Sequence, residues 1–138
     1  MSWDVLIMRL PQEIQTYDDL SACESDPMLP LGTLEDVRRH VDATFPDTDW
    51  SDPRWGIWRG LEGSIEFSLG RDGDAPLEHL MLHVRAGDEI VGRIVALCEG
   101  AGWKALDTSA TEFLVSAADT SGLSGWRSLR DRAAGRDA

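Results

Sequence analysis

The residues whose types and spacing could form a binding site are Trp58, Glu66, His83 and Arg85. Glu66, His83 and Arg85 occupy polar positions in two segments where apolar and polar residues alternate, as they do in half-buried strands. Antiparallel pairing of these segments places Glu66 opposite His83 and diagonal to Arg85. Arg85 is therefore expected to pair with an acid, either Glu66 or Asp88 at the start of the next helix. Tryptophan and arginine on one open face are typical of interface hot spots, so this face is the candidate binding surface.

Three of the six tryptophans lie within nine residues, at Trp50, Trp55 and Trp58. In the segment RWGIWRG, Trp55 and Ile57 share one face of the expected strand, and Trp58 lies on the other. We expect Trp55 in the core and Trp58 on the polar face beside Glu66. Trp50 is expected to pack over the turn at the corner between the preceding helix and this strand.

Metal binding and nucleophilic catalysis have little support in the spacing. His79 and His83 lie on one strand face about 13 Å apart, too far to share an ion, and His40 lies in a different segment. The chain has no Gly-x-Ser-x-Gly motif, and the sequence around Cys23 and Cys98 gives no cue for a paired general base. We therefore expect no catalytic residue, no metal and no cofactor, and a binding protein rather than an enzyme.

A sheet and two helices must position these residues. The expected strands are 2–10, 54–60, 64–70, 77–86, 103–107 and 112–116, and the helices begin after Thr33 and Asp88 and end at Pro46 and at Gly100 or Gly102. This order, β-α-β-β-β-α-β-β, predicts an α+β fold. Its mostly antiparallel sheet should have five to six strands, with the two helices packed on one face.

The remaining segments have weaker patterns. Residues 11–32 show no clear period beyond a short turn near Tyr17–Leu20, and they should cover a sheet edge or carry the binding function. We expect one domain over residues 1–116, followed by a basic C-terminal tail, residues 117–138. Its segment Trp126–Arg132 is expected to dock as a short helix near the acidic first third of the chain or over the open sheet face.

The charge excludes some classes of partner. The net charge is −12, and residues 1–53 hold 12 acidic and 3 basic residues. Nucleic-acid phosphates and anionic membranes should repel such a domain, whereas a basic protein should be attracted; solubility alone would also account for the charge. The first residues lack a basic signal-peptide region, their apolar run is too short to span a bilayer, and two cysteines make no disulfide framework. The protein is therefore expected in the cytoplasm, with reduced thiols.

Five segments resemble a group of small acidic bacterial proteins of unknown function: MSWDVLIMRLP, FPDTDWSDPRWG, GSIEFSLG, LMLHVRAGD and GWKALDTSATEFL. The resemblance covers about residues 1–115. In the group, two glycines usually follow the arginine that corresponds to Arg85, and Ala86 stands here in place of the first of them. The resemblance implies no activity, but some such proteins are similar to the immunity partners of secreted bacterial toxins.

These observations favour a cytoplasmic protein-interaction module, in particular an immunity-like partner of a basic toxin. The first alternative is a small-ligand binder or an enzyme that uses the polar sheet face. The second is a structural homo-oligomer, such as a homodimer, in which the open face pairs with itself. The face could also be an ordinary half-exposed sheet surface, or one that the tail covers.

Overall fold

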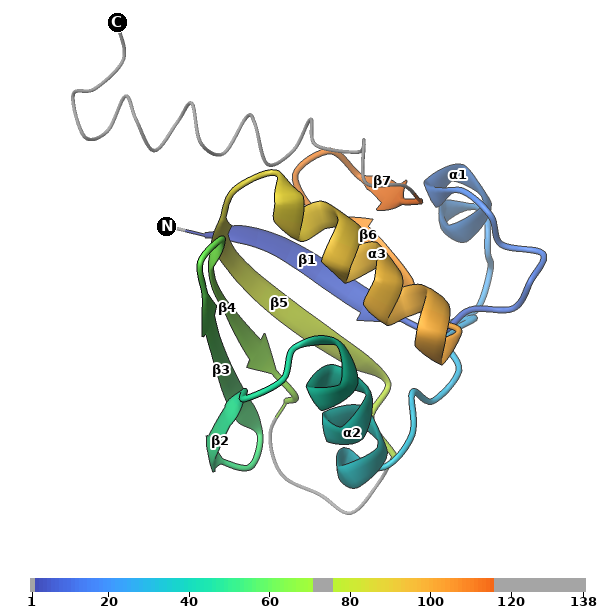
Figure 1. Cartoon of the computed structure of the whole chain (residues 1–138). Coiled ribbons are helices and arrows are strands. Elements are labelled where there is room, and N and C mark those ends of the chain that lie inside the picture. The colour runs from blue at the N-terminus through green and yellow to red at the C-terminus, as the bar shows by residue number, and fades with distance from the viewer. Residues whose placement is uncertain (1, 71–75, 116–138) are drawn as a thin grey trace, which may run out of the picture.

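The computed structural model describes residues 2–70 and 76–115, which form one seven-stranded antiparallel sheet and three helices (Figure 1). The strands are β1 (Trp3–Met8), β2 (Asp49–Asp52), β3 (Trp55–Gly60), β4 (Gly63–Ser68), β5 (His79–Ala86), β6 (Lys104–Asp107) and β7 (Glu112–Leu114). The helices are α1 (Tyr17–Ser21), α2 (Leu34–Thr44) and α3 (Glu89–Ala101). The predicted α+β class is confirmed. The predictions for the tail, including a helix at Trp126–Arg132, concern residues outside those described.

The strands lie in the order β2-β3-β4-β5-β1-β6-β7, and every neighbouring pair is antiparallel. The strand count exceeds the expected five to six because Asp49–Asp52 forms the edge strand β2. Its side chains are exposed except for the half-buried Trp50, so its sequence carries no apolar alternation. Helices α2 and α3 pack together on one face of the sheet, as expected (Figure 1).

The ends of the two long helices follow their sequence signals. The Thr33 hydroxyl accepts a hydrogen bond from the Asp36 backbone N–H at 3.1 Å, and an Asp36 carboxylate oxygen accepts one from the Thr33 N–H at 3.3 Å. This reciprocal capping box satisfies two N–H groups that the first turn of α2 cannot pair internally. Helix α3 begins after Asp88 as predicted, although the Asp88 side chain makes no capping hydrogen bond, and its C-cap is Gly102, whose φ of 73° favours glycine.

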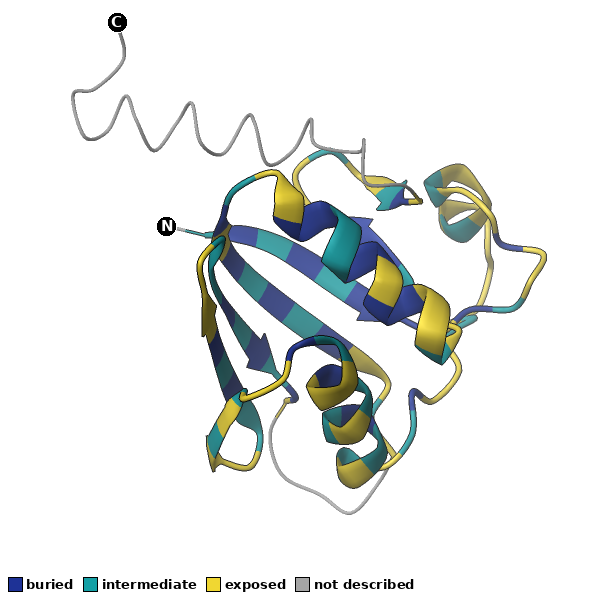
Figure 2. Cartoon of the chain, in the orientation of Figure 1, coloured by how far each residue is buried: buried dark blue, intermediate teal, exposed yellow. Residues whose placement is uncertain are grey.

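The main core lies between the sheet and helices α2 and α3. Buried and half-buried residues alternate along β4 and β5, so one side of each strand faces this core (Figure 2). At its centre, the Phe45 ring makes a T-shaped contact with Trp58 at 5.1 Å between centroids and a tilted contact with Phe67 at 5.4 Å. Such aromatic pairs stabilise beyond the area that they bury.

Arg93 of α3 connects this aromatic cluster to its surroundings. Its guanidinium lies 4.7 Å from the ring centroid of Phe45 and 4.7 Å from that of Trp58. It also donates a 2.7 Å hydrogen bond to the Thr44 carbonyl and lies 3.5 Å from a Glu62 carboxylate oxygen. One side chain therefore ties α3 to the end of α2 and to the β3–β4 turn.

A smaller apolar cluster lies on the opposite face of the sheet, at the end formed by β1, β6 and β7. Its buried members are Met8, Leu10, Ile14 and Leu106, with Leu6, Tyr17, Leu20, Met28 and Phe113 packed against them. Residues 11–32, including α1, thus cover part of a sheet face rather than only an edge. The same face remains uncovered by α1 along β3, β4 and β5, where its side chains keep partial exposure.

The prediction for two tryptophans is wrong, and their positions are reversed. Trp58 is only 4% exposed and lies in the core, whereas Trp55 is half-buried on the polar face. Gly56 and Gly60 lie on the core side of β3 and leave room for indole rings. A Cβ at Gly60 would lie 2.4 Å from the Trp58 ring, and one at Gly56 would lie 2.6 Å from the Trp50 ring. The two glycines therefore mark the face of β3 that packs large aromatic side chains.

Replacing each of these tryptophans by alanine should separate their roles. Trp58→Ala should lower the free energy of unfolding by roughly 3–5 kcal/mol, because it leaves a cavity beside Phe45. Trp55→Ala should cost about 1 kcal/mol, as expected for a partly solvated side chain. Urea unfolding of both variants measures the difference. Equal losses would contradict the burial of Trp58.

Candidate functional site

The candidate site is the open face, defined as the side of β3, β4, β5 and the start of β1 that points away from α2 and α3. Its residues are Asp4, Trp55, Ile57, Arg59, Ser64, Glu66, Ser68, Met81, His83 and Arg85, all half-buried or exposed. The strand register aligns Ile57, Glu66, His83 and Asp4 in one row across four strands. The predicted pairing of Glu66 with His83 is confirmed. Arg85 lies opposite Ser64 in the next row.

Glu66 is held by two donors from neighbouring strands. Arg85 Nη1 donates to Glu66 Oε2 at 2.7 Å, and Trp55 Nε1 donates to Glu66 Oε1 at 3.4 Å. The Arg85 hydrogen bond is the main cause that lowers the pKa of Glu66 below its usual value, and Trp55 adds to it. The predicted pairing of Arg85 with an acid is confirmed, with Glu66 as the partner. Both carboxylate oxygens of Glu66 are thus oriented by the sheet.

His83 is fixed in orientation by two contacts. Its Nδ1 lies 2.9 Å from Asp4 Oδ1, and the Trp55 indole stacks on its ring at 5.6 Å between centroids and an interplanar angle of 21°. An imidazole whose Nδ1 is held in this way presents Nε2 as the nitrogen available to a partner. Arg85, Glu66, Trp55, His83 and Asp4 therefore form one continuous network across four strands.

This network has no activated nucleophile. Ser2 Oγ donates to Asp4 Oδ1 at 2.6 Å, and the same oxygen contacts His83 Nδ1. In a Ser-His-Asp triad the serine hydroxyl would instead donate to the imidazole. Both Ser2 and His83 compete here for one carboxylate oxygen, so the geometry suits orientation of the imidazole rather than proton transfer from serine.

The histidines considered as metal ligands from the sequence do not form a shared site. His79 lies opposite Met8 while His83 lies opposite Asp4, and His40 packs its ring edge against Trp103 at 5.1 Å. Within residues 2–70 and 76–115, no three His, Cys, Asp or Glu side chains are grouped so that they could hold a metal ion. Cys23 and Cys98 are both free thiols. Burial raises the pKa of the Cys98 thiol to about 12, which keeps it protonated and unreactive.

Sequence reasoning found three members of the network and missed two. Glu66, His83 and Arg85 come together as expected, whereas Trp58 does not join them. Trp55 takes its place, and the signal that could have found it is the pair of glycines flanking Trp58 on the core side of β3. Asp4 carried no local signal, because its role depends on the pairing of β1 with β5.

Trp50 lies at the helix–strand corner, as expected. Its Nε1 donates to Asp42 Oδ1 of α2 at 2.8 Å, and the Arg38 guanidinium lies 5.1 Å from its ring centroid. Trp50 therefore joins β2 to α2 and has a structural role, and it is not part of the open face.

Removing the charge of Arg85 should have a small effect on stability. The Arg85 side chain is 45% exposed and that of Glu66 is 28% exposed, so water screens their attraction. Arg85→Leu should lower the free energy of unfolding by less than about 1 kcal/mol. Urea unfolding of Arg85→Leu, Glu66→Gln and the double variant gives the coupling energy. A loss above about 3 kcal/mol would mean that the pair behaves as a buried one.

The contribution of Glu66 should depend on pH in a defined direction. Its pKa in the folded state is lower than the ordinary value of 4.5, so ionised Glu66 stabilises the fold above that value. The contribution is lost as the pH falls through the folded-state pKa. The stability difference between the native chain and Glu66→Gln should therefore be constant near neutral pH and shrink below 4.5. Unfolding of both proteins across this range, with exposed Glu78→Gln as control, measures it; a difference that grows on acidification would contradict the assignment.

Comparisons with known proteins add no information about the site. A scan against protein-family models gave no match, and searches of curated proteins and of solved structures also gave none. In the part of the chain that the structure describes, none of the helices has the length and apolar character needed to cross a membrane.

Proposed function

We propose that this chain is a protein-interaction module of the cytoplasm, whose open face binds a basic protein partner. The observation that carries the proposal is the ordered network in which a half-buried tryptophan, Trp55, is stacked on His83 and hydrogen-bonded to Glu66. A side chain already held in one conformation loses little entropy when a partner covers it. Tryptophan and arginine are also the residue types that most often dominate binding energy at interfaces.

The distribution of charge suggests that different parts of the protein attract the partner and recognise it. On the open face two acids, Asp4 and Glu66, stand against two arginines, Arg59 and Arg85, so the face itself is nearly balanced. The net charge of −12 comes mainly from the first 53 residues. Long-range attraction of a basic partner would therefore come from the body of the protein, and specificity from the face.

The resemblance to small acidic bacterial proteins leads to a narrower form of this proposal. If the basic partner is a secreted toxin, the chain would act as its immunity protein by occupying the toxin's basic surface. An acidic inhibitor suits this role because opposite net charges raise the rate of association. The residue-level support for this form is the same network on the open face.

The two alternatives have less support from the geometry. An enzyme that used this face would need an activated group, whereas Ser2 and His83 share one Asp4 oxygen. A small-ligand binder would need a concave site, whereas the residues of the network lie in rows across four neighbouring strands. A homo-oligomer built on the open face would bring together two copies that each carry a net charge of −12. Like charges of this size oppose association at low salt.

Affinity capture from native lysate of the source cells tests the proposal. The tagged full chain should retain a basic protein in stoichiometric amount at about 50 mM salt and lose it progressively as screening increases. Trp55→Ala should abolish retention. Leu61→Ala is the control, because Leu61 is a fully exposed apolar residue at the β3–β4 turn, outside the open face.

Two results would contradict the proposal. One is the absence of any stoichiometric partner at low salt; the other is retention that Trp55→Ala leaves unchanged. Sedimentation of the purified chain at high concentration provides the test of the homo-oligomer, and a dimer dissociated by Trp55→Ala would favour that alternative instead.

A further inference from the structure

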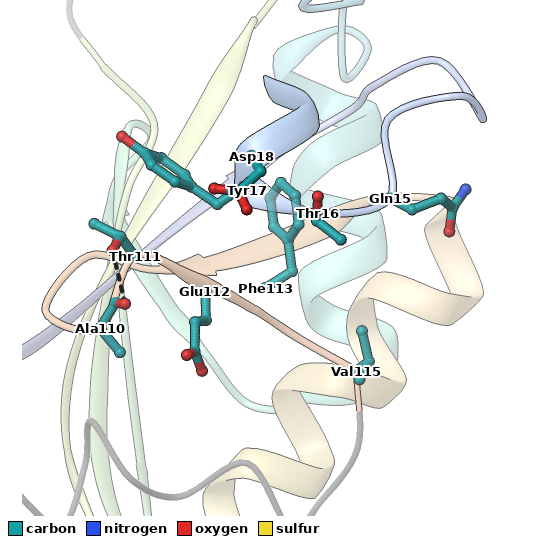
Figure 3. Close-up of a pocket in the computed structure, with 9 residues that line it drawn as sticks. All are labelled: Gln15, Thr16, Tyr17, Asp18, Ala110, Thr111, Glu112, Phe113 and Val115. Atoms are coloured by element: carbon teal, nitrogen blue, oxygen red, sulfur yellow. Dashed lines mark hydrogen bonds between the residues drawn. The ribbon is translucent and has the colours of Figure 1, made fainter. Parts of the chain in front are cut away.

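A second feature of the surface lies beside the edge strand β7, away from the open face. A hollow of about 650 Å³ is lined by residues 15–18 at the start of α1, by residues 110–113 and by Val115 (Figure 3). A smaller hollow of about 180 Å³ is lined in part by Val95, Cys98 and Glu99 of α3. The two hollows share Gln15, Phe113 and Val115 in their linings. We call them together the β7 groove.

Both walls of the larger hollow are fixed by hydrogen bonds. On one wall, Asp19 Oδ2 accepts from the backbone N–H groups of Gln15 and Thr16, and the Thr16 hydroxyl accepts from the Asp19 N–H. On the other wall, Asp107 Oδ1 accepts from the backbone N–H groups of Ser109 and Ala110 and orders the β6–β7 turn. The groove is therefore a preformed feature of the fold, not a gap between loose loops.

The groove lies at an edge of the sheet formed by the described strands. Among these strands, β7 pairs only with β6, and Val115 directly after it is 71% exposed. Edge strands of this kind are usually shielded by another segment or by charge. Phe113 and Val115 offer apolar surface for such a segment to cover.

The charges around the groove select the kind of segment that fits. Among the residues that the structure describes, the larger hollow is lined by the acids Asp18 and Glu112 and by no lysine or arginine, and the smaller one contains Glu99 and Lys104. A second copy of the chain placed there would bring the same acids against one another. The groove therefore favours an occupant that carries arginine or lysine together with an apolar anchor.

We propose that the β7 groove binds the chain's own C-terminal residues, 117–138. The chain leaves β7 at Val115, inside the groove, so these residues are tethered at the site and act at a high effective concentration. They contain Trp126 and four arginines, at 127, 130, 132 and 136. Trp126 supplies the apolar anchor over Phe113 and Val115, and the arginines lie against Asp18 and Glu112. The open face then stays available to a partner, so the proposal does not depend on the proposed function.

Full-chain variants test this assignment by hydrogen exchange of the backbone amides of residues 112–115. Trp126→Ala should raise their exchange rate roughly tenfold, as expected when an aromatic anchor is truncated. Replacing Arg127 and Arg130 by glutamine should raise the rate more at low salt than at high salt, because charge attraction is screened. Leu61→Ala at the β3–β4 turn is the control, because Leu61 is fully exposed and does not line the groove, and it should leave these amides unchanged.

A rescue experiment separates the possible occupants. In a chain ending at Ser116, the same amides should exchange faster, and a synthetic peptide of residues 117–138 added in trans should slow them again. Unchanged exchange in both Trp126→Ala and the arginine variant would overturn the proposal. Protection of these amides in the shortened chain together with a dimeric mass would also overturn it, because a second copy would then occupy the groove.

Discussion

The burial of the Trp58 indole against Phe45 is the constraint on which the rest of the structure depends. Side chains alternate along a strand, so placing Trp58 in the core turns Trp55 to the opposite face. Arg93 then covers both rings and joins α3 to the end of α2 and to the β3–β4 turn. The helix layer and the composition of the open face thus follow from one aromatic contact.

The face of the sheet that points away from α2 and α3 is covered at one end and open at the other, and the side chains on it explain the difference. Around Leu106 and Met8 the face is apolar, and residues 11–32 cover it because its exposure to water would be unfavourable. Along β3, β4 and β5 the polar side chains satisfy one another, as Arg85 and Glu66 do. Such a surface is stable in water without a cover, and it can also exchange water for a partner.

The sequence was sufficient to predict those features whose signals lie within one segment or within two neighbouring segments. Thr33 and Asp36 mark the start of α2 three residues apart, and the alternation in two segments set Glu66 opposite His83. It was insufficient for β3, because RWGIWRG carries a tryptophan on each face and only the packing of Phe45 decides between them. Asp4 joins the network through a strand pairing across most of the chain, which no local pattern encodes.

The position of β1 inside the sheet has a consequence for the order in which the protein folds. β1 is made first on the ribosome, yet its neighbours are β5 and β6, which begin at His79 and Lys104. The meander from β2 to β5 can pair as it emerges, whereas β1 must wait with its apolar residues exposed. Pairings of such long range slow folding, and they leave the apolar residues of β1 without their sheet neighbours until most of the domain has been synthesised.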